Sequence, residues 1–214
     1  MSYTTKTDEI REIELLLEAD FPPAAERRFA WALTGSGHYL LECLAAALAL
    51  SAVDFFLTRA AEEVLPMYGW TVERLRQRLK EQTQGRGRVI RDSSASSVPV
   101  GLLYRGHYHT VVIAPATSNT VAKCVCGISD TLATNMYAQA GKCRIPSIVF
   151  ACDADPVVVT EAPDGKVVLY PRVIDLDNTA RLRQFEMTSV VTSPDELAEA
   201  LVRHEPCRSP ACCS

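Results

Sequence analysis

The sequence lacks both an excess of basic residues and a long, uninterrupted apolar run. Its 214 residues include 22 lysines and arginines against 26 aspartates and glutamates, which gives a net charge of −4. Broad binding to nucleic acid needs a basic surface instead. The best candidate for a membrane span is interrupted by Arg59, Glu62 and Glu63, and a span tolerates few such charges. We therefore expect neither a nucleic-acid partner nor a membrane partner.

The beginning of the sequence lacks the pattern of an export signal, which is a basic start followed by an apolar segment. The acidic residues found there instead are Asp8, Glu9, Glu12, Glu14 and Glu18. We therefore expect a cytoplasmic location. In that compartment the eight cysteines do not indicate a disulfide framework.

The cysteines also lack the CxxC spacing of a metal knuckle, so no metal site is predicted. Those with apolar sequence neighbours are predicted to be reduced core residues: Cys43, Cys124, Cys126, Cys143 and Cys152. The other three, Cys207, Cys212 and Cys213, lie in a polar end that contains proline. For this end a frayed, reactive segment is the main interpretation, and a metal or redox role is the alternative.

Apolar segments that alternate with helical patterns indicate the fold. Hydrophobic residues make up 48% of the chain, which suffices for the core of one domain. Strands are predicted at 29–33, 53–57, 110–114 and 146–151, a hairpin at 157–160 and 166–170, and helices at 38–50, 118–127, 130–140 and 194–204, with others from 59 and 71. We expect a single-domain, three-layer α/β fold with a flavodoxin-like (Rossmann-like), doubly wound parallel sheet.

The domain limits follow from the same pattern. Residues 29–204 are predicted to form the main domain, preceded by a helical extension at 1–28 and followed by the cysteine-containing tail at 205–214. Residues 83–99 are predicted to form a long loop because they are rich in Gly, Ser and Arg. This loop either lies over a ligand or is a surface insertion. His107 and His109 are predicted to be exposed loop residues, with a catalytic histidine as the alternative.

Polar residues follow three predicted strands, at the sheet edge where ligands bind in such folds. The first group is Thr34-Gly35-Ser36-Gly37-His38, a turn whose glycines would let an anion approach the next helix. It lacks the third glycine of the dinucleotide fingerprint and is not a Walker loop. The second group is Thr58-Arg59 and the third is residues 115–120, PATSNT. A tight connection or a helix cap is the alternative for each group.

The third group resembles the PASANT motif of the homo-oligomeric flavin-containing decarboxylase superfamily. The following GISDTL also resembles that superfamily's GxxDxL continuation. The stretches TGSGHYL, TRAAEEVLPMYG and APATSNTVAKCVCGISDTLATN are most similar to its archaeoflavoprotein and dihydromethanopterin reductase branch. The PXMNXXMW segment of the cysteine decarboxylases and the PRE segment of the prenyl-FMN-forming relatives have no counterpart in this sequence.

The resemblance implies FMN as cofactor and assigns roles to residues. Gly35, Ser36 and Gly37 would bind the phosphate, with Thr58 adding a hydroxyl. His38 and Ala116 would also contact the cofactor, and Asp130 would cap the second of two helices near the subunit contact. The ribityl chain and the ring edge would be lined by Thr117, Ser118, Asn119 and Thr120. Asn119 and His38 are the candidate catalytic residues.

The resemblance also implies a reaction. We expect an oxidoreductase that reduces 7,8-dihydromethanopterin to tetrahydromethanopterin with FMN as the relay, recharged by NAD(P)H or a ferredoxin-like carrier. An electron-transfer flavoprotein that docks a ferredoxin and a flavin-dependent decarboxylase are the alternatives. Homotrimers that join into a larger cage are expected.

Overall fold

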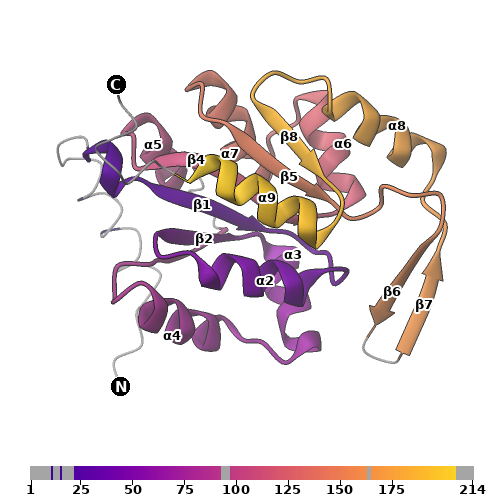
Figure 1. Cartoon of the computed structure of the whole chain (residues 1–214), viewed down its shortest axis with the longest axis horizontal. Coiled ribbons are helices and arrows are strands. Elements are labelled where there is room, and N and C mark those ends of the chain that lie inside the picture. Colours follow the sequence, from indigo (N-terminus) through magenta and orange to yellow (C-terminus); the bar gives the residue numbers. More distant parts are fainter. Residues whose placement is uncertain (1–10, 12–14, 16–21, 93–96, 163–164, 206–214) are drawn as a thin grey trace.

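The computed structural model describes residues 11, 15, 22–92, 97–162 and 165–205, and its centre is a six-stranded parallel sheet (Figure 1). The strand order is β3-β2-β1-β4-β5-β8. Its strands are Arg28–Leu33 (β1), Val53–Leu57 (β2), Val89–Arg91 (β3), Tyr108–Ala116 (β4), Ser147–Ala151 (β5) and Thr188–Val191 (β8). All residues of β1, β2 and β5 are buried, as expected for continuous apolar runs in a sheet covered on both faces.

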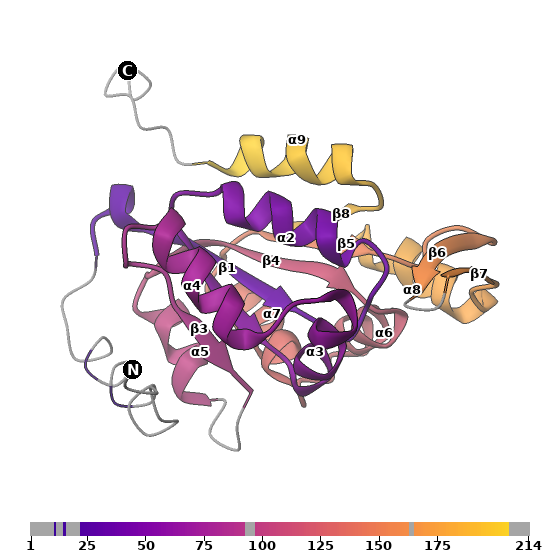
Figure 2. The same ribbon diagram turned by 90° about the horizontal axis from the view of Figure 1, so that it is seen from below.

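Helices cover both faces of the sheet (Figure 2). One face carries α2 (Leu40–Ala49), α4 (Val72–Gln82) and α9 (Pro194–His204); the other carries α5 (Ser97–Tyr104), α6 (Ser118–Cys126) and α7 (Leu132–Lys142). The remaining elements are η1 (Ala24–Glu26), α3 (Arg59–Val64), η2 (Leu65–Tyr68), α8 (Val173–Leu182) and the antiparallel hairpin β6 (Val158–Ala162) and β7 (Gly165–Leu169). The predicted three-layer, doubly wound α/β fold is confirmed, with the strand order of the Rossmann form.

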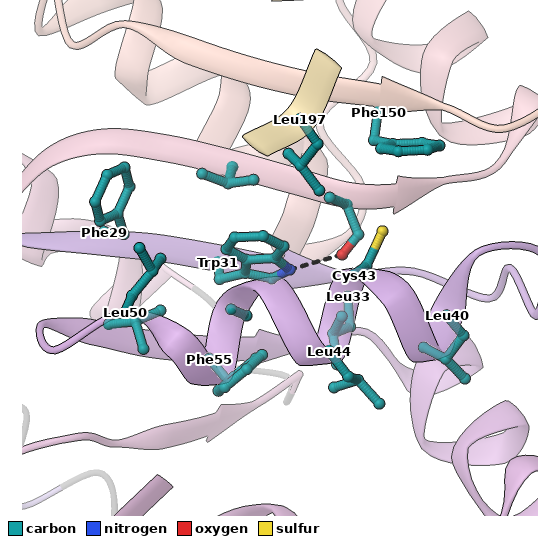
Figure 3. Packing of buried hydrophobic residues seen from close by; sticks show 14 of the residues in the cluster. Phe29, Trp31, Leu33, Leu40, Cys43, Leu44, Leu50, Phe55, Phe150 and Leu197 are labelled. Atoms are coloured by element: carbon teal, nitrogen blue, oxygen red, sulfur yellow. Dashed lines mark hydrogen bonds between the residues drawn. The ribbon is translucent and has the colours of Figure 1, made fainter. Parts of the chain in front are cut away.

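Each face of the sheet has its own hydrophobic core. Alternate residues of a strand point to opposite faces, and in β1 the large residues Phe29, Trp31 and Leu33 pack toward α2 and α9, whereas the alanines between them face α7. The buried indole Nε1 of Trp31 donates a hydrogen bond to the carbonyl of Ala114 at 2.7 Å (Figure 3). This bond ties β1 to β4.

Several predicted boundaries differ from the structure. The predicted loop at 83–99 contains strand β3 and the beginning of α5, and neither β8 nor α8 was predicted. Strand β3 has only three residues and lies at the sheet edge, so its apolar pattern is short. Strand β4 continues through the cis peptide bond before Pro115 to Ala116.

Two predicted helix starts are also wrong. Helix α2 begins at Leu40 because Tyr39 adopts a left-handed conformation with φ of 59°. Helix α7 is capped by Thr131, whose side chain accepts a hydrogen bond from the amide of Thr134. Asp130, the predicted cap, instead binds Lys123 Nζ at 2.8 Å. The prediction of α9 from its Ser193 cap is confirmed.

The predictions for single residues are partly confirmed. Cys43, Cys124 and Cys152 are buried, but Cys126 is exposed and Cys143 is half-buried. The prediction of exposed loop histidines is wrong, because His107 is buried and His109 lies half-buried within β4. Most of the predicted helical extension at 1–28, residues 93–96 of the predicted loop and the cysteines of the tail lie outside the described residues. No helix in the described ranges has the length and apolarity that a membrane crossing needs.

Candidate functional site

The site lies where the order of the strands reverses. From β1 the chain builds β2 and β3 on one side and then crosses to β4 on the other. The turns after β1 and β4 are therefore neighbours at the carboxyl edge of the sheet, the usual ligand position in such folds. Thr34 joins them: its buried hydroxyl donates to the carbonyl of Pro115 at 2.7 Å and accepts from the amide of Thr117 at 3.2 Å. The first and third predicted groups are thus brought together.

The glycines after β1 permit close contacts with α3 and η2. A β-carbon placed on Gly35 would lie 2.7 Å from Cβ of Ala60, and one on Gly37 would lie 2.0 Å from the hydroxyl of Tyr68. The β-carbon of Ala60 is fixed by the backbone of α3, so only glycine fits at position 35, whereas a side chain at position 37 would require the ring of Tyr68 to move. From the sequence, these glycines were predicted to let an anion approach the backbone. The structure adds a second reason for them, which is the close packing against α3 and η2.

Helix α2 leaves its N-terminus without a side-chain cap. Tyr39 at the N-cap makes no capping hydrogen bond, and the hydroxyl of Ser36 donates to the carbonyl of His38 at 3.3 Å. The first amides of a helix and its dipole together favour an anion. The turn can therefore bind a phosphate through backbone groups.

Thr58 is engaged within the protein. Its buried hydroxyl donates to the carbonyl of Leu33 at 3.1 Å and accepts from the amide of Ala61 at 3.2 Å. A hydroxyl has one proton, so Thr58 would have to give up the Leu33 bond to donate to a phosphate. The neighbouring Arg59 is exposed at the first residue of α3.

Some of the polar residues after β4 make hydrogen bonds within the protein, and others are exposed. Thr117 caps α6, with its hydroxyl bonded to the amide and the hydroxyl of the buried Thr120 at 3.2 and 3.0 Å. Ala116 is fully buried, and its carbonyl accepts from the amide of Cys152 at 3.2 Å. Asn119 is exposed, and its carboxamide has no hydrogen-bond partner among the described residues. Of these residues Asn119 is the exposed one, whereas Thr117 and Ser118 are half-buried.

Asp153, just beyond β5, is a site residue that the sequence analysis missed. Its Oδ2 accepts hydrogen bonds from the amide of Ser118, at 3.3 Å, and from the Ser118 hydroxyl. An acidic residue two positions after a buried strand was the available signal, since the rule of ligand binding at strand ends selected the other three groups. Asp153 thus adds a carboxylate from a third strand to the site.

His38 is the titratable side chain of the first turn. Burial lowers its pKa below the ordinary value, and the carboxylates of Asp153 and Glu42 partly oppose that shift. The imidazole is therefore mainly neutral at neutral pH. Cys152 is buried below this polar layer, and burial raises the pKa of its thiol to about 12, so the thiol keeps its proton at neutral pH.

Comparison with known proteins identifies the family. The family profile described as Flavoprotein matches residues 23–208. The chain belongs to the flavoprotein family. The resemblance to the flavin-containing decarboxylase superfamily is thereby confirmed.

Individual relatives agree with the branch indicated by the motifs. An uncharacterized protein of Methanocaldococcus jannaschii is 34% identical over 83% of this chain and 95% of its own length. A dihydromethanopterin reductase (acceptor) of Methanosarcina mazei is 37% identical over 64% of this chain. The match covers only 59% of the length of that relative. The crystal structure of Burkholderia xenovorans DmrB in complex with FMN, described as a cubic protein cage for redox transfer, is 62% identical with a TM-score of 0.74 and covers 83% of this chain and 94% of DmrB.

Proposed function

We propose that this chain is an FMN-dependent oxidoreductase that reduces 7,8-dihydromethanopterin to tetrahydromethanopterin. The observation that carries the proposal is the junction of the β1 and β4 turns by Thr34 at the switch point of the sheet. This junction places an uncapped helix N-terminus beside a row of hydroxyl and carboxamide groups. Such a donor set suits a ligand with one phosphate and a polar chain. The named reductase relatives and the FMN complex of DmrB support the choice of substrate and cofactor.

The residues of this chain fit FMN in the following way. Gly35, Ser36 and Gly37 and the first amides of α2 would hold the phosphate, with His38 in the same turn. Thr58 and Ala116 would support the turns on either side. The ribityl chain and the ring edge would contact the first turn of α6: Thr117, Ser118, Asn119 and Thr120. FMN supplies the hydride or the electrons when bound.

Two residues are our candidates for contact with the reacting ring and the pterin. Asn119 presents an exposed carboxamide at the site, which can both donate and accept a hydrogen bond. His38 holds a largely neutral imidazole, so it can donate from one ring nitrogen and accept at the other. We further propose a cytoplasmic, trimer-based assembly whose electron donor is NAD(P)H or a ferredoxin-like carrier.

One assay tests the reaction. The photoreduced protein is mixed anaerobically with 7,8-dihydromethanopterin, and the flavin absorbance is followed. We expect rapid flavin reoxidation together with formation of tetrahydromethanopterin. Reoxidation by a ferredoxin but not by the pterin would identify an electron carrier instead.

Mass spectrometry of the released chromophore tests the cofactor separately. We expect FMN, because the site offers a single phosphate-sized turn and no second nucleotide fingerprint. Release of FAD, or a colourless protein that takes up no added FMN, would contradict the proposal before any assay of the pterin.

A further inference from the structure

Asp153 is flanked by two turns of the candidate site. Strand β5 pairs with β4 (Figure 1), and Asp153, just after β5, binds Ser118 in the first turn of α6. On the other side, the thiol of the preceding Cys152 donates to the carbonyl of His38 at 3.6 Å. The half-buried carboxylate therefore lies where the turns after β1 and β4 meet.

The two carboxylate oxygens of Asp153 differ in their contacts. Oδ2 accepts two hydrogen bonds, one from the amide and one from the hydroxyl of Ser118. Oδ1 has no hydrogen-bond partner among the described residues, and it is not fully buried. A carboxylate oxygen can accept about two hydrogen bonds. Oδ1 is thus an accessible acceptor at the site.

Asp153 also lacks a cation partner. Asp54, Asp130 and Asp175 are each paired with a lysine or an arginine, but Asp153 forms no ion pair within the described part of the chain. Capping of α6 does not explain the carboxylate, because Thr117 already caps this helix. A carboxylate that is partly removed from water is stabilised by hydrogen-bond donors. We therefore expect a ligand to supply donors to Oδ1.

The chemistry of such a ligand differs from that of the group bound after β1. The first amides of α2 are donors that suit a phosphate, whereas Asp153 would repel a phosphate beside it. The 2-amino-4-oxopyrimidine ring of a pterin has two adjacent donors, the N3–H and the 2-amino group. A carboxylate accepts hydrogen bonds from such a pair as it does from a guanidinium group. The corresponding edge of a flavin has one N–H between two carbonyl groups, which a carboxylate repels.

We propose that Asp153 selects the pterin ring of the substrate by accepting hydrogen bonds from its N3–H and 2-amino groups at Oδ1. The inference rests on the function proposed above and adds the part of the substrate that the site recognises, which is the ring and not the side chain attached to it. A pterin with a short substituent should therefore bind. A lumazine, in which a carbonyl replaces the 2-amino group, should bind much more weakly.

Asp153→Asn should reverse this preference because of the hydrogen bonds to Ser118. The two donors of Ser118 require an acceptor at the position of Oδ2, so the carboxamide oxygen should take that position and the NH₂ group should replace Oδ1. The contact with α6 is then kept, while the accessible group changes from an acceptor to a donor. This donor matches the carbonyl of a lumazine and opposes the amino group of a pterin.

The test titrates the oxidised, FMN-loaded protein at neutral pH with 6-methylpterin and with 6-methyllumazine, by isothermal titration calorimetry. We expect wild type to bind the pterin about tenfold to a hundredfold more tightly than the lumazine, and Asp153→Asn to bind the lumazine more tightly. Asp155→Asn is the matched control, because the exposed Asp155 lies two residues further along and the variant loses the same charge. It should keep the wild-type preference.

Several results would overturn the inference while the proposed function stands. These are equal affinity of wild type for the two rings, an unchanged preference in Asp153→Asn, and an equal change in Asp155→Asn. Wild type that reacts with 7,8-dihydromethanopterin but binds neither ring would also overturn it, because recognition would then depend on the side chain of the substrate. So would loss of flavin absorbance from Asp153→Asn, because the carboxylate would then hold the ribityl hydroxyl groups.

Failure of the proposed function gives a different result. In that case wild type binds neither ring, and its photoreduced flavin is not reoxidised by 7,8-dihydromethanopterin. The inference about Asp153 would then fail together with the function on which it rests.

Discussion

The two ends of the parallel sheet both carry polar side chains, but they use them differently. At the amino end Asp54 is fully buried within β2. It accepts hydrogen bonds from Arg28 Nε and the amide of Arg88, both at 3.0 Å, and from the hydroxyl of Tyr108 at 2.9 Å. At the carboxyl end polar side chains such as those of Arg59 and Asn119 are exposed, and those of His38 and Asp153 are half-buried.

This difference indicates that the polar groups at the amino end stabilise the fold, whereas those at the carboxyl end are available for ligand binding. A buried carboxylate with several donors inside the protein holds the strands together, and no ligand could reach it. Burial beside Asp54 raises the pKa of Tyr108, so this phenol keeps its proton and remains a donor. Polar groups that face outward at a switch point cost little to leave hydrated in the free protein, and they remain available to a ligand. The following predictions test this division, from the largest expected effect to the smallest.

Replacing Asp54 should give the largest loss of stability. Asp54→Asn removes the carboxylate that faces the guanidinium groups of Arg28 and Arg88, which lie 3.0 and 3.4 Å away. Breaking a buried ion pair from one side typically costs about 3–5 kcal/mol. Urea denaturation should show this loss, while the fraction that remains folded should bind FMN normally.

The matched control is Asp130→Asn. Asp130 also pairs with a cation, Lys123, but it is exposed, and exposed pairs contribute little. Unchanged stability is expected for the control. If both variants lost equal stability, or if Asp54→Asn abolished FMN binding in folded protein, the division between the two ends would be wrong.

Stability at acid pH should depend on His109, near the amino end of β4. Burial, with His204 and Arg27 nearby, lowers the pKa of His109 from 6.5 to about 4. Between these values the unfolded chain binds a proton that the folded protein does not, so the free energy of unfolding falls as the pH decreases. Over that range the loss is at most about 3 kcal/mol.

Urea denaturation between pH 7 and 4 checks this effect. The advantage of wild type over His109→Gln should shrink as the pH falls. For His38→Gln, at the carboxyl end, the corresponding change should be smaller, because Asp153 and Glu42 oppose the lowering of the His38 pKa. If the stability of the two variants relative to wild type changed equally with pH, the larger lowering of the His109 pKa would be contradicted.

Replacing Asn119 should weaken FMN binding without reducing stability. The side chain is exposed in the free chain, so folding does not depend on it. Loss of one polar ligand contact typically costs about 1–3 kcal/mol, so fluorescence titration of Asn119→Ala should show a dissociation constant raised about tenfold. Ser129→Ala, which is exposed just beyond α6, should bind normally. Normal affinity in Asn119→Ala would leave the carboxamide without a role in binding.

The central elements could be predicted from sequence because their burial is complete. Strands β1 and β5 each contain an uninterrupted apolar run, at 29–33 and 148–151, and β2 is apolar except for Asp54. The cap at Ser193 defines the start of α9. Strands β3 and β8 lie at the two edges of the sheet and are short, so their patterns are weak. The left-handed Tyr39 has no sequence signal, since a positive φ is uncommon for a residue other than glycine.

The sequence also indicated which turns form the candidate site, and the structure brings the turns after β1 and β4 together. The sequence did not indicate which hydrogen bonds each side chain makes. The rule that ligands bind at carboxyl ends of parallel strands selected the turns after β1, β2 and β4. It could not show that the Thr58 hydroxyl is engaged by Leu33 and Ala61, or that Asn119 is exposed. These depend on how α3 and α6 pack after the turns. The structural role of Asp54 was not predicted, because a single charged residue within an otherwise apolar strand does not indicate its hydrogen-bond partners.

The smallest expected effect concerns Glu42, an exposed acid in the first turn of α2. If the N-terminus of this helix holds the FMN phosphate, Glu42 opposes binding, because its charge has the same sign as the phosphate. A charge in the first turn of a helix is worth about 0.3–1 kcal/mol at low ionic strength. Glu42→Gln should therefore bind FMN about twofold to fivefold more tightly at low salt. The gain should decrease as salt screens the interaction.

Glu73→Gln provides the matched control, because Glu73 is also an exposed acid in the first turn of a helix, α4, which Thr71 caps. It should leave FMN affinity unchanged at every salt concentration. Titrations of wild type and both variants from low to high salt distinguish a local effect from a change in net charge, since each variant loses one negative charge. Equal gains in the two variants would mean that the phosphate responds to the charge of the whole protein. Weaker binding in Glu42→Gln would place the phosphate away from the N-terminus of α2.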